Sequence, residues 1–76
     1  MRELIEEITR SLVDYPEDVK VTETRVNDNV TIEIVVNPSD MGKVIGKQGK
    51  IAKAIRTVAK AAGTKENLYV QVDIVD

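Results

Sequence analysis

The sequence contains no cysteine and no histidine. Without these residues the chain has no disulfide, no thiolate or imidazole ligand for a metal, no cysteine nucleophile and no histidine general base. Metalloenzymes and hydrolases that depend on a catalytic triad are therefore disfavoured. We expect a protein that is not an enzyme and that carries no cofactor.

Aromatic residues and long apolar runs are also scarce. Tyr15 and Tyr69 are the only aromatic residues, because tryptophan and phenylalanine are absent. No run approaches the roughly 18 apolar residues of a membrane span, and residues 1–7 lack the apolar core of a signal peptide. We therefore expect a soluble, cytoplasmic protein that does not contact the membrane. Its length predicts one domain over residues 1–76.

Charge is segregated along the chain, although the net charge is only −2. Residues 41–65 contain seven of the eleven lysines and arginines and no acidic residue. The rest of the chain balances four cations against all thirteen acids, which leaves −9. A local positive field of this kind steers an anionic partner, such as a nucleic acid, to one face and repels it from the others.

Hydrophobic periodicity predicts six secondary-structure elements. An amphipathic helix comes first, followed by two strands, a short helix, a longer helix and a third strand. The expected elements span residues 3–13, 19–26, 30–36, 39–45, 50–62 and 68–75. The apolar stripe of the first helix is expected to comprise Leu4, Ile5, Ile8 and Leu12.

The three strands are expected to form one mixed sheet. Asn27, Asp28 and Asn29 read as the turn of an antiparallel hairpin between the first two strands. The second strand is the more apolar one and is therefore predicted to be central. The third strand should pair with it in parallel, because a helical crossover joins them. The inward-facing residues are predicted to be Val30, Ile32, Ile34 and Val36 on the second strand and Leu68, Val70, Val72 and Ile74 on the third.

The long helix is predicted to pack one side on the sheet and to face outward with the other. Ser39 or Asp40 is expected to cap the short helix before it, and Gly63 is expected to end the long one. The predicted fold class is α+β, with the helices packed on one face of a three-stranded sheet. The apolar side comprises Ile51, Ala54, Ile55, Val58 and Ala62, and the basic side Lys53, Arg56 and Lys60.

A glycine-bracketed basic segment lies between the two predicted helices. Gly46 and Gly49 allow the backbone of a ligand to approach closely, because neither residue has a Cβ. Lys47 and Gln48 between them supply a positive charge, amide donors and an acceptor. Two glycines alone are a weak signal, but their place between two helices strengthens it. We predict that this loop grips the backbone of a nucleic acid.

Residues 42–51 read Gly-Lys-Val-Ile-Gly-Lys-Gln-Gly-Lys-Ile. Together with the element order α-β-β-α-α-β, this segment resembles a KH domain of the prokaryotic, type II arrangement. The small size and the core of residues 44–49, Val-Ile-Gly-Lys-Gln-Gly, make the chain similar to the bacterial single-domain KhpA family, and the resemblance covers essentially the whole chain. The resemblance implies binding of single-stranded RNA, with the loop holding the backbone of about four nucleotides.

The resemblance also implies roles for the matching residues. The two loop glycines would allow close approach, the two residues between them would meet phosphates, and Ile45 and Ile51 would form an apolar floor under the bases. Lys65, Val70 and Val72 would belong to the other wall of the groove. The set expected to bind RNA is Lys43, Ile45, Gly46, Lys47, Gln48, Gly49, Lys50, Ile51 and Lys53.

Protein partners are implied by the same resemblance. KhpA-like proteins are understood to form homodimers and to pair with a larger KH-containing protein called KhpB, Jag or EloR. The resemblance therefore implies a homodimer, a heterodimer with such a protein, or both. It further implies an RNA chaperone or post-transcriptional regulator linked to cell elongation, cell shape and cell-wall biogenesis.

Two other functions deserve comparison with RNA binding. A nucleotide site of the Walker type is disfavoured, because the glycines have the wrong spacing and Ile51 stands where that motif needs a hydroxyl. A dimerisation or adaptor module, whose loop is only a turn, stays open as an alternative. Exposed alanines and valines of the long helix could form its symmetric interface.

Overall fold

The computed structural model describes the backbone of residues 1–76 and every side chain except that of Lys47. Its elements follow the predicted order, with one short 3₁₀ helix in addition. The helices are α1 (Arg2–Leu12), η1 (Pro16–Asp18) and α2 (Pro38–Lys65), and the strands are β1 (Lys20–Val26), β2 (Asn29–Val35) and β3 (Tyr69–Val75).

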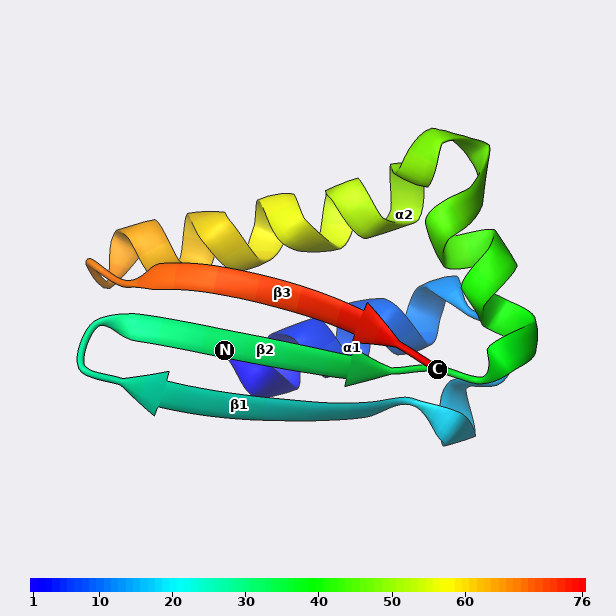
Figure 1. Cartoon of the computed structure of the whole chain (residues 1–76), viewed down its shortest axis with the longest axis horizontal. Coiled ribbons are helices and arrows are strands. Elements are labelled where there is room, and N and C mark those ends of the chain that lie inside the picture. The colour runs from blue at the N-terminus through cyan, green and yellow to red at the C-terminus, as the bar shows by residue number, and fades with distance from the viewer.

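The sheet has the predicted order, with β2 between β1 and β3 (Figure 1). The hairpin is antiparallel and aligns Val21 with Ile34, whereas β3 runs parallel to β2 and aligns Val72 with Ile32. Asn27 in the hairpin turn has a φ of +56°, a conformation that asparagine tolerates better than most residues. The predicted central strand and the predicted parallel crossover are both confirmed.

The α2 helix turns sharply in its middle. Gln48 and Gly49 have φ angles of +64° and +66°, which interrupt the right-handed helix. Figure 1 shows the ribbon changing direction between a first arm (residues 38–47) and a longer second arm (residues 50–65). The two predicted helices are thus present as two arms that meet at the glycine loop.

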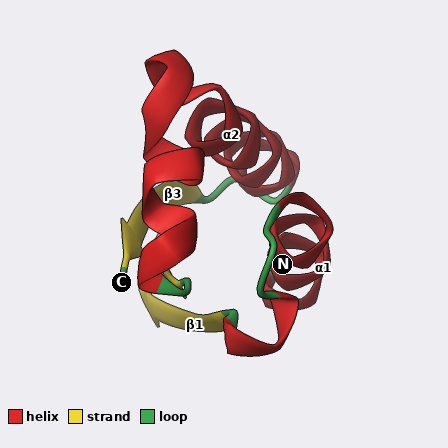
Figure 2. Ribbon diagram, turned by 90° about the vertical axis from the view of Figure 1, so that its right-hand side faces the viewer, coloured by secondary structure: helices red, strands yellow, loops and turns green.

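The helices form one layer against the sheet. Figure 2 shows α1 and the second arm side by side on the same face of the sheet. The second arm packs along β3 and α1 along β1, while the first arm crosses the end of the sheet where β2 and β3 stop (Figure 1). The core between the layers includes Ile5, Val19, Val21, Val30, Ile32, Ile34, Val36, Ile55, Ala59 and Val72.

The buried face of α1 differs from the predicted stripe in one position. Leu4 is 45% exposed, whereas Ile5 and Thr9 are completely buried. Thr9 fits into the core because its Oγ1 donates to the Ile5 carbonyl oxygen at 2.8 Å, which satisfies the hydroxyl without water. The prediction that placed Leu4 inward is therefore wrong, because the helix is rotated to bury the Ile5–Thr9 line.

The buried face of the second arm is also rotated from the prediction. Ala54 is exposed, and the deepest row consists instead of Ala52, Ile55, Ala59 and Gly63. These residues are spaced three, four and four apart, so they lie on one helical stripe. Three of the four are small, which lets the helix backbone approach the sheet closely. The predicted burial of Ile55 is correct, and that of Ala54 is not.

Gly63 does not end the helix, contrary to the prediction. A Cβ at this position would clash with Val70 Cγ2 and would lie 3.1 Å from the carbonyl oxygen of Leu68. The glycine is needed because the chain returns into β3 directly against it. The helix continues to Lys65, and Asn67 then adopts the left-handed conformation with a φ of +61°.

The start of α2 also differs from the prediction, which assigned the cap to Ser39 or Asp40. The Oδ1 of Asn37 accepts a hydrogen bond from the Ser39 amide at 2.7 Å and caps the helix. The Asp40 side chain is 1% exposed and accepts hydrogen bonds from the amides of Asp14 at 3.0 Å and Tyr15 at 3.1 Å. Asp40 therefore fastens the first arm to the segment that follows α1.

Candidate nucleic-acid interface

The loop between the two arms presents bare backbone to solvent. In the described part of the chain, no heavy atom from beyond the local helix lies within 4 Å of a Cβ built on Gly46 or Gly49. Glycine is favoured at position 49, because a φ of +66° costs most other residues about 1 kcal/mol or more. Among the described residues, no part of the chain beyond the adjacent residues and the local helix therefore blocks the approach of a ligand to the main chain at these two positions.

The predicted loop residues surround this open backbone. Gln48 and Lys50 are exposed, and Ile45 is 47% exposed although it is apolar. Ile51 is half-buried and packs against the core, so it anchors the second arm while part of its side chain remains accessible. The predicted contact of the Lys47 side chain lies outside the described residues.

The free edge of β3 runs beside the second arm. The Tyr69 amide donates to the Asp28 carbonyl oxygen at 2.8 Å, and the Val75 carbonyl oxygen accepts from the Val36 amide at 3.0 Å. Because alternate residues of a strand direct their backbone groups to opposite sides, the amides and carbonyls of Val70 and Val72 point to the free edge. The edge thus offers hydrogen-bonding groups to a ligand.

The side chains of these two valines have a different place. Val72 is 6% exposed and belongs to the core, and Val70 is partly buried against the same core. Both were predicted to form a groove wall. In the structure, the backbone groups of Val70 and Val72 lie at the free edge where this wall was predicted, whereas the Val72 side chain points into the core.

A basic stripe runs along the second arm from the loop to the start of β3. Residues 49, 53, 56, 60 and 64 are spaced four, three, four and four apart, so they follow one line along the second arm. Lys53 and Lys60 are exposed and Arg56 is half-buried. Lys60 and Val70 line the same hollow, which shows that this line faces the edge of β3. We call the loop, this stripe and the free edge together the basic face.

Two lysines that were predicted for the RNA-binding groove have other surroundings in the structure: Lys43 is ion-paired, and Lys65 lies away from the loop. The Lys43 Nζ lies 3.1 Å from Asp14 Oδ1 and forms an exposed ion pair with it. Lys65 lies near the C-terminal end of α2, where it lines a hollow together with Met1 and Leu4. Fifteen residues at about 1.5 Å each separate it from Lys50 by about 22 Å. The structure does not bring Lys65 to the loop.

Sequence reasoning missed two contributions to this surface. Asp40 holds the first arm in place through amides 25 and 26 residues away, and such a contact leaves no periodic pattern in the sequence. Lys60 was predicted to face outward, but its position beside the start of β3 depends on how the second arm packs. The signal available in the sequence was the spacing of residues 49, 53, 56 and 60, which are three or four apart and therefore place Lys60 on the same side of the helix as the loop.

Among the described residues, no group of three or more metal-ligating side chains could hold a metal ion. No helix built from them is both long and apolar enough to cross a membrane.

Comparisons with known proteins agree on one family. The family model described as "KhpA/KhpB, KH domain" matches residues 2–74. Curated relatives named RNA-binding protein KhpA include one from Clostridium perfringens, which is 60% identical over 99% of this chain and 100% of its own length. A second, from Halalkalibacterium halodurans, is 51% identical over the full length of both chains.

Solved structures show the same fold at lower sequence identity. An Aquifex aeolicus Era variant bound to GDP.AlF4- has a TM-score of 0.72 and 17% identity, and the match covers 97% of this chain and 29% of that one. Era in complex with MgGDPNP and nucleotides 1506–1542 of 16S ribosomal RNA has a TM-score of 0.67 and 19% identity, with 97% and 28% covered.

Proposed function

This chain belongs to the KhpA/KhpB KH-domain family, and from this membership we propose that it binds single-stranded RNA without catalysing a reaction on it. One observation carries the proposal. The open backbone at Gly46 and Gly49 lies inside residues 41–65, a segment with seven cations and no acid. An open backbone in a positive field is suited to a phosphate chain.

The basic face supports a division of labour between its parts. The loop, with Lys47, Gln48 and Lys50, would hold the phosphates of about four nucleotides and fix the position of the RNA. The exposed part of Ile45 would support a base, and the free backbone groups of β3 would meet base edges. Phosphate contacts carry no sequence information, so any base preference would come from these apolar and backbone contacts.

Residues 1–76 would act as one KH domain together with a protein partner. The family is named for KhpA and KhpB together, which supports a second KH-containing chain as that partner, in a homodimer or a heterodimer. Leu4 is 45% exposed and lines a hollow with Met1 and Ala62, at the end of α2 away from the loop. A partner that binds around this hollow, which Lys65 and Glu66 also line, would leave the loop free for RNA.

The family resemblance supports a finer assignment as well. We place the activity in the cytoplasm, as RNA chaperoning or post-transcriptional regulation that contributes to cell elongation and cell-wall homeostasis. A partner would matter for affinity, because four nucleotides offer little contact area and a second RNA-binding domain raises the effective concentration.

The Gly46→Ala substitution tests the proposed close approach. The added methyl group meets no neighbouring part of the protein, and alanine favours the helix by about 0.5–1 kcal/mol, so the fold is retained. We expect the affinity for single-stranded RNA to fall about tenfold, which corresponds to one lost charge-assisted hydrogen bond. Fluorescence anisotropy with a labelled RNA oligomer measures this change.

The Gly42→Ala substitution is the matched control. It places the same methyl group in the same arm of α2, again with no other part of the protein within 4 Å, but one helical turn before the loop. We expect its RNA affinity to equal that of the wild type. If both alanine variants bind like the wild type, the RNA backbone does not approach Gly46.

A further inference from the structure

The start of β3 carries an exposed aromatic residue beyond the reach of the loop. Tyr69 is 75% exposed, the largest exposure among the large apolar and aromatic side chains, whereas Tyr15 is 43% exposed. Its neighbour Val70 turns toward the core, so Tyr69 stands on the opposite, open face at the free edge of the sheet. Nothing in the packing of the core requires an aromatic ring here.

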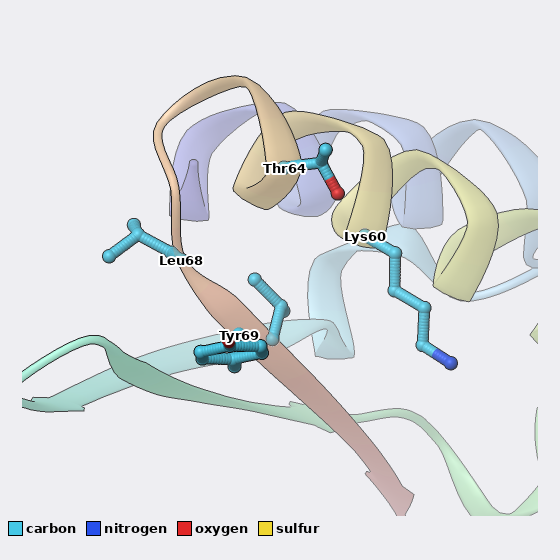
Figure 3. A pocket seen from close by; sticks show the side chains of 5 residues that line it. Lys60, Thr64, Leu68 and Tyr69 are labelled. Carbon is cyan, nitrogen blue, oxygen red and sulfur yellow. The ribbon is translucent and has the colours of Figure 1, made fainter.

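A hollow of about 230 Å³ adjoins this tyrosine. It is lined by Lys60 and Thr64 of the second arm and by Leu68, Tyr69 and Val70 at the start of β3. Figure 3 shows Lys60 extending from the helix alongside the strand, with Tyr69 at the beginning of that strand. The described residues that line the hollow thus include an aromatic ring, a cation and a hydroxyl group, and no carboxylate.

The basic stripe ends at this hollow. Gly49 and Lys60 are eleven residues apart, which is about 17 Å along the second arm at 1.5 Å per residue. Lys53 and Arg56 lie between them on the same line. A strand of RNA that follows the stripe from the loop therefore reaches this hollow, where it can turn over the free edge onto the Tyr69 ring. Asp28, whose carbonyl oxygen accepts from the Tyr69 amide, and the acids Glu66 and Asp73 near Tyr69 in the sequence do not line the hollow.

We propose that Tyr69, Lys60 and Thr64 form a nucleotide subsite at the end of the basic face, where one base of single-stranded RNA stacks on Tyr69 and its phosphate meets Lys60. This inference rests on the proposed function and extends it beyond the nucleotides held at the loop. Aromatic side chains bind bases of single strands by stacking, with little dependence on base identity. The subsite therefore lengthens the RNA footprint without adding sequence preference.

Three RNA oligomers test the subsite. One contains about four core nucleotides, and the others extend that core by about four nucleotides on the 5′ or the 3′ side. Because RNA has one polarity in the groove, we expect only one of the extended oligomers to bind the wild type more tightly, by about tenfold. The Tyr69→Thr substitution, which keeps a β-branched residue in the strand, should abolish this gain and leave binding of the core oligomer unchanged.

Further variants separate stacking from other effects. Tyr69→Phe should retain the gain because the ring suffices, whereas Tyr15→Thr removes the other tyrosine and should also retain it.

Lys60→Ala should reduce the slope of log affinity against log salt concentration by about 0.7 for the better extended oligomer. Tyr69→Trp creates the only tryptophan of the chain, and its fluorescence should be quenched by that oligomer alone.

The outcomes distinguish this inference from the proposed function. Equal affinity for all three oligomers, or a gain that persists in Tyr69→Thr, would overturn the subsite while leaving RNA binding at the loop in place. Failure of the wild type to bind even the core oligomer would overturn the proposed function itself.

Discussion

Replacing both residues between the loop glycines with aspartate is expected to weaken single-stranded RNA binding by at least about 100-fold. Lys47→Asp and Gln48→Asp together remove a cation and an amide donor and place two negative charges beside the phosphates. Each lost contact to a charged group costs about 1.5–3 kcal/mol, and the new repulsion adds to this loss. The fold should persist, because Gln48 is exposed and aspartate tolerates its φ of +64°.

The control for this variant is Lys20→Asp with Thr22→Asp. Both side chains are exposed on β1, away from the basic face, and the net charge falls from −2 to −5 in either double variant. We expect the control to bind RNA nearly as tightly as the wild type. The loop variant should also show a salt dependence that is shallower by about 0.7 for each phosphate contact it has lost. Equal weakening in both variants would mean that only overall charge matters.

Removing the Asp40 carboxylate is expected to lower the free energy of unfolding by about 2–4 kcal/mol. Asp40→Ala removes a buried carboxylate and leaves the partly buried amides of Asp14 and Tyr15 without their acceptors, and each unsatisfied group costs about 1–3 kcal/mol. A chain of this length has a total stability of about 4–11 kcal/mol, so the loss is a large fraction. Urea denaturation followed by circular dichroism measures the change.

Asp14→Ala provides the comparison for this loss. It removes the exposed carboxylate that pairs with Lys43 but retains the backbone amide that donates to Asp40. Because exposed ion pairs contribute little, we expect a change of less than about 1 kcal/mol. If Asp40→Ala is as stable as Asp14→Ala, the Asp40 side chain does not fasten the first arm.

The sheet was predictable because buried and exposed residues alternate along a strand, and this alternation is visible in the sequence. The alternation of Val30, Ile32, Ile34 and Val36 gave the buried face of β2, and all four are buried in the structure. The parallel pairing of β3 followed from the helical crossover before it. These predictions needed no knowledge of contacts between elements.

The helix faces were less predictable because several residue types satisfy a buried position. Thr9 is buried in α1 since its hydroxyl bonds to its own helix, and Ala52 is buried in α2 since a small residue allows close packing. Gly63 was predicted to end the helix, but its actual constraint is the approach of Val70 from the strand that follows. Which of these residues is buried depends on how each helix packs on the sheet, and hydrophobic periodicity does not encode that packing.

The candidate site was predictable as far as it is local. The loop at Gly46 and Gly49 was recognised from spacing and charge, and the structure gives it an open backbone. The distant parts of the site were harder to place, because they depend on how the second arm lies on β3. Lys65, predicted for the other wall of the groove, lies at the C-terminal end of α2, where it lines a hollow with Met1 and Leu4.

The most direct test of RNA binding at the loop is an amide NMR titration of the full chain with a short single-stranded RNA. We expect the largest shift changes at the amides of residues 46–51, with further changes at Val70 and Val72, whose amides point to the free edge of β3. The amides of α1 and β1 should barely move. Changes centred on Leu4 and Ala62, or no changes at residues 46–51, would contradict RNA binding at the loop.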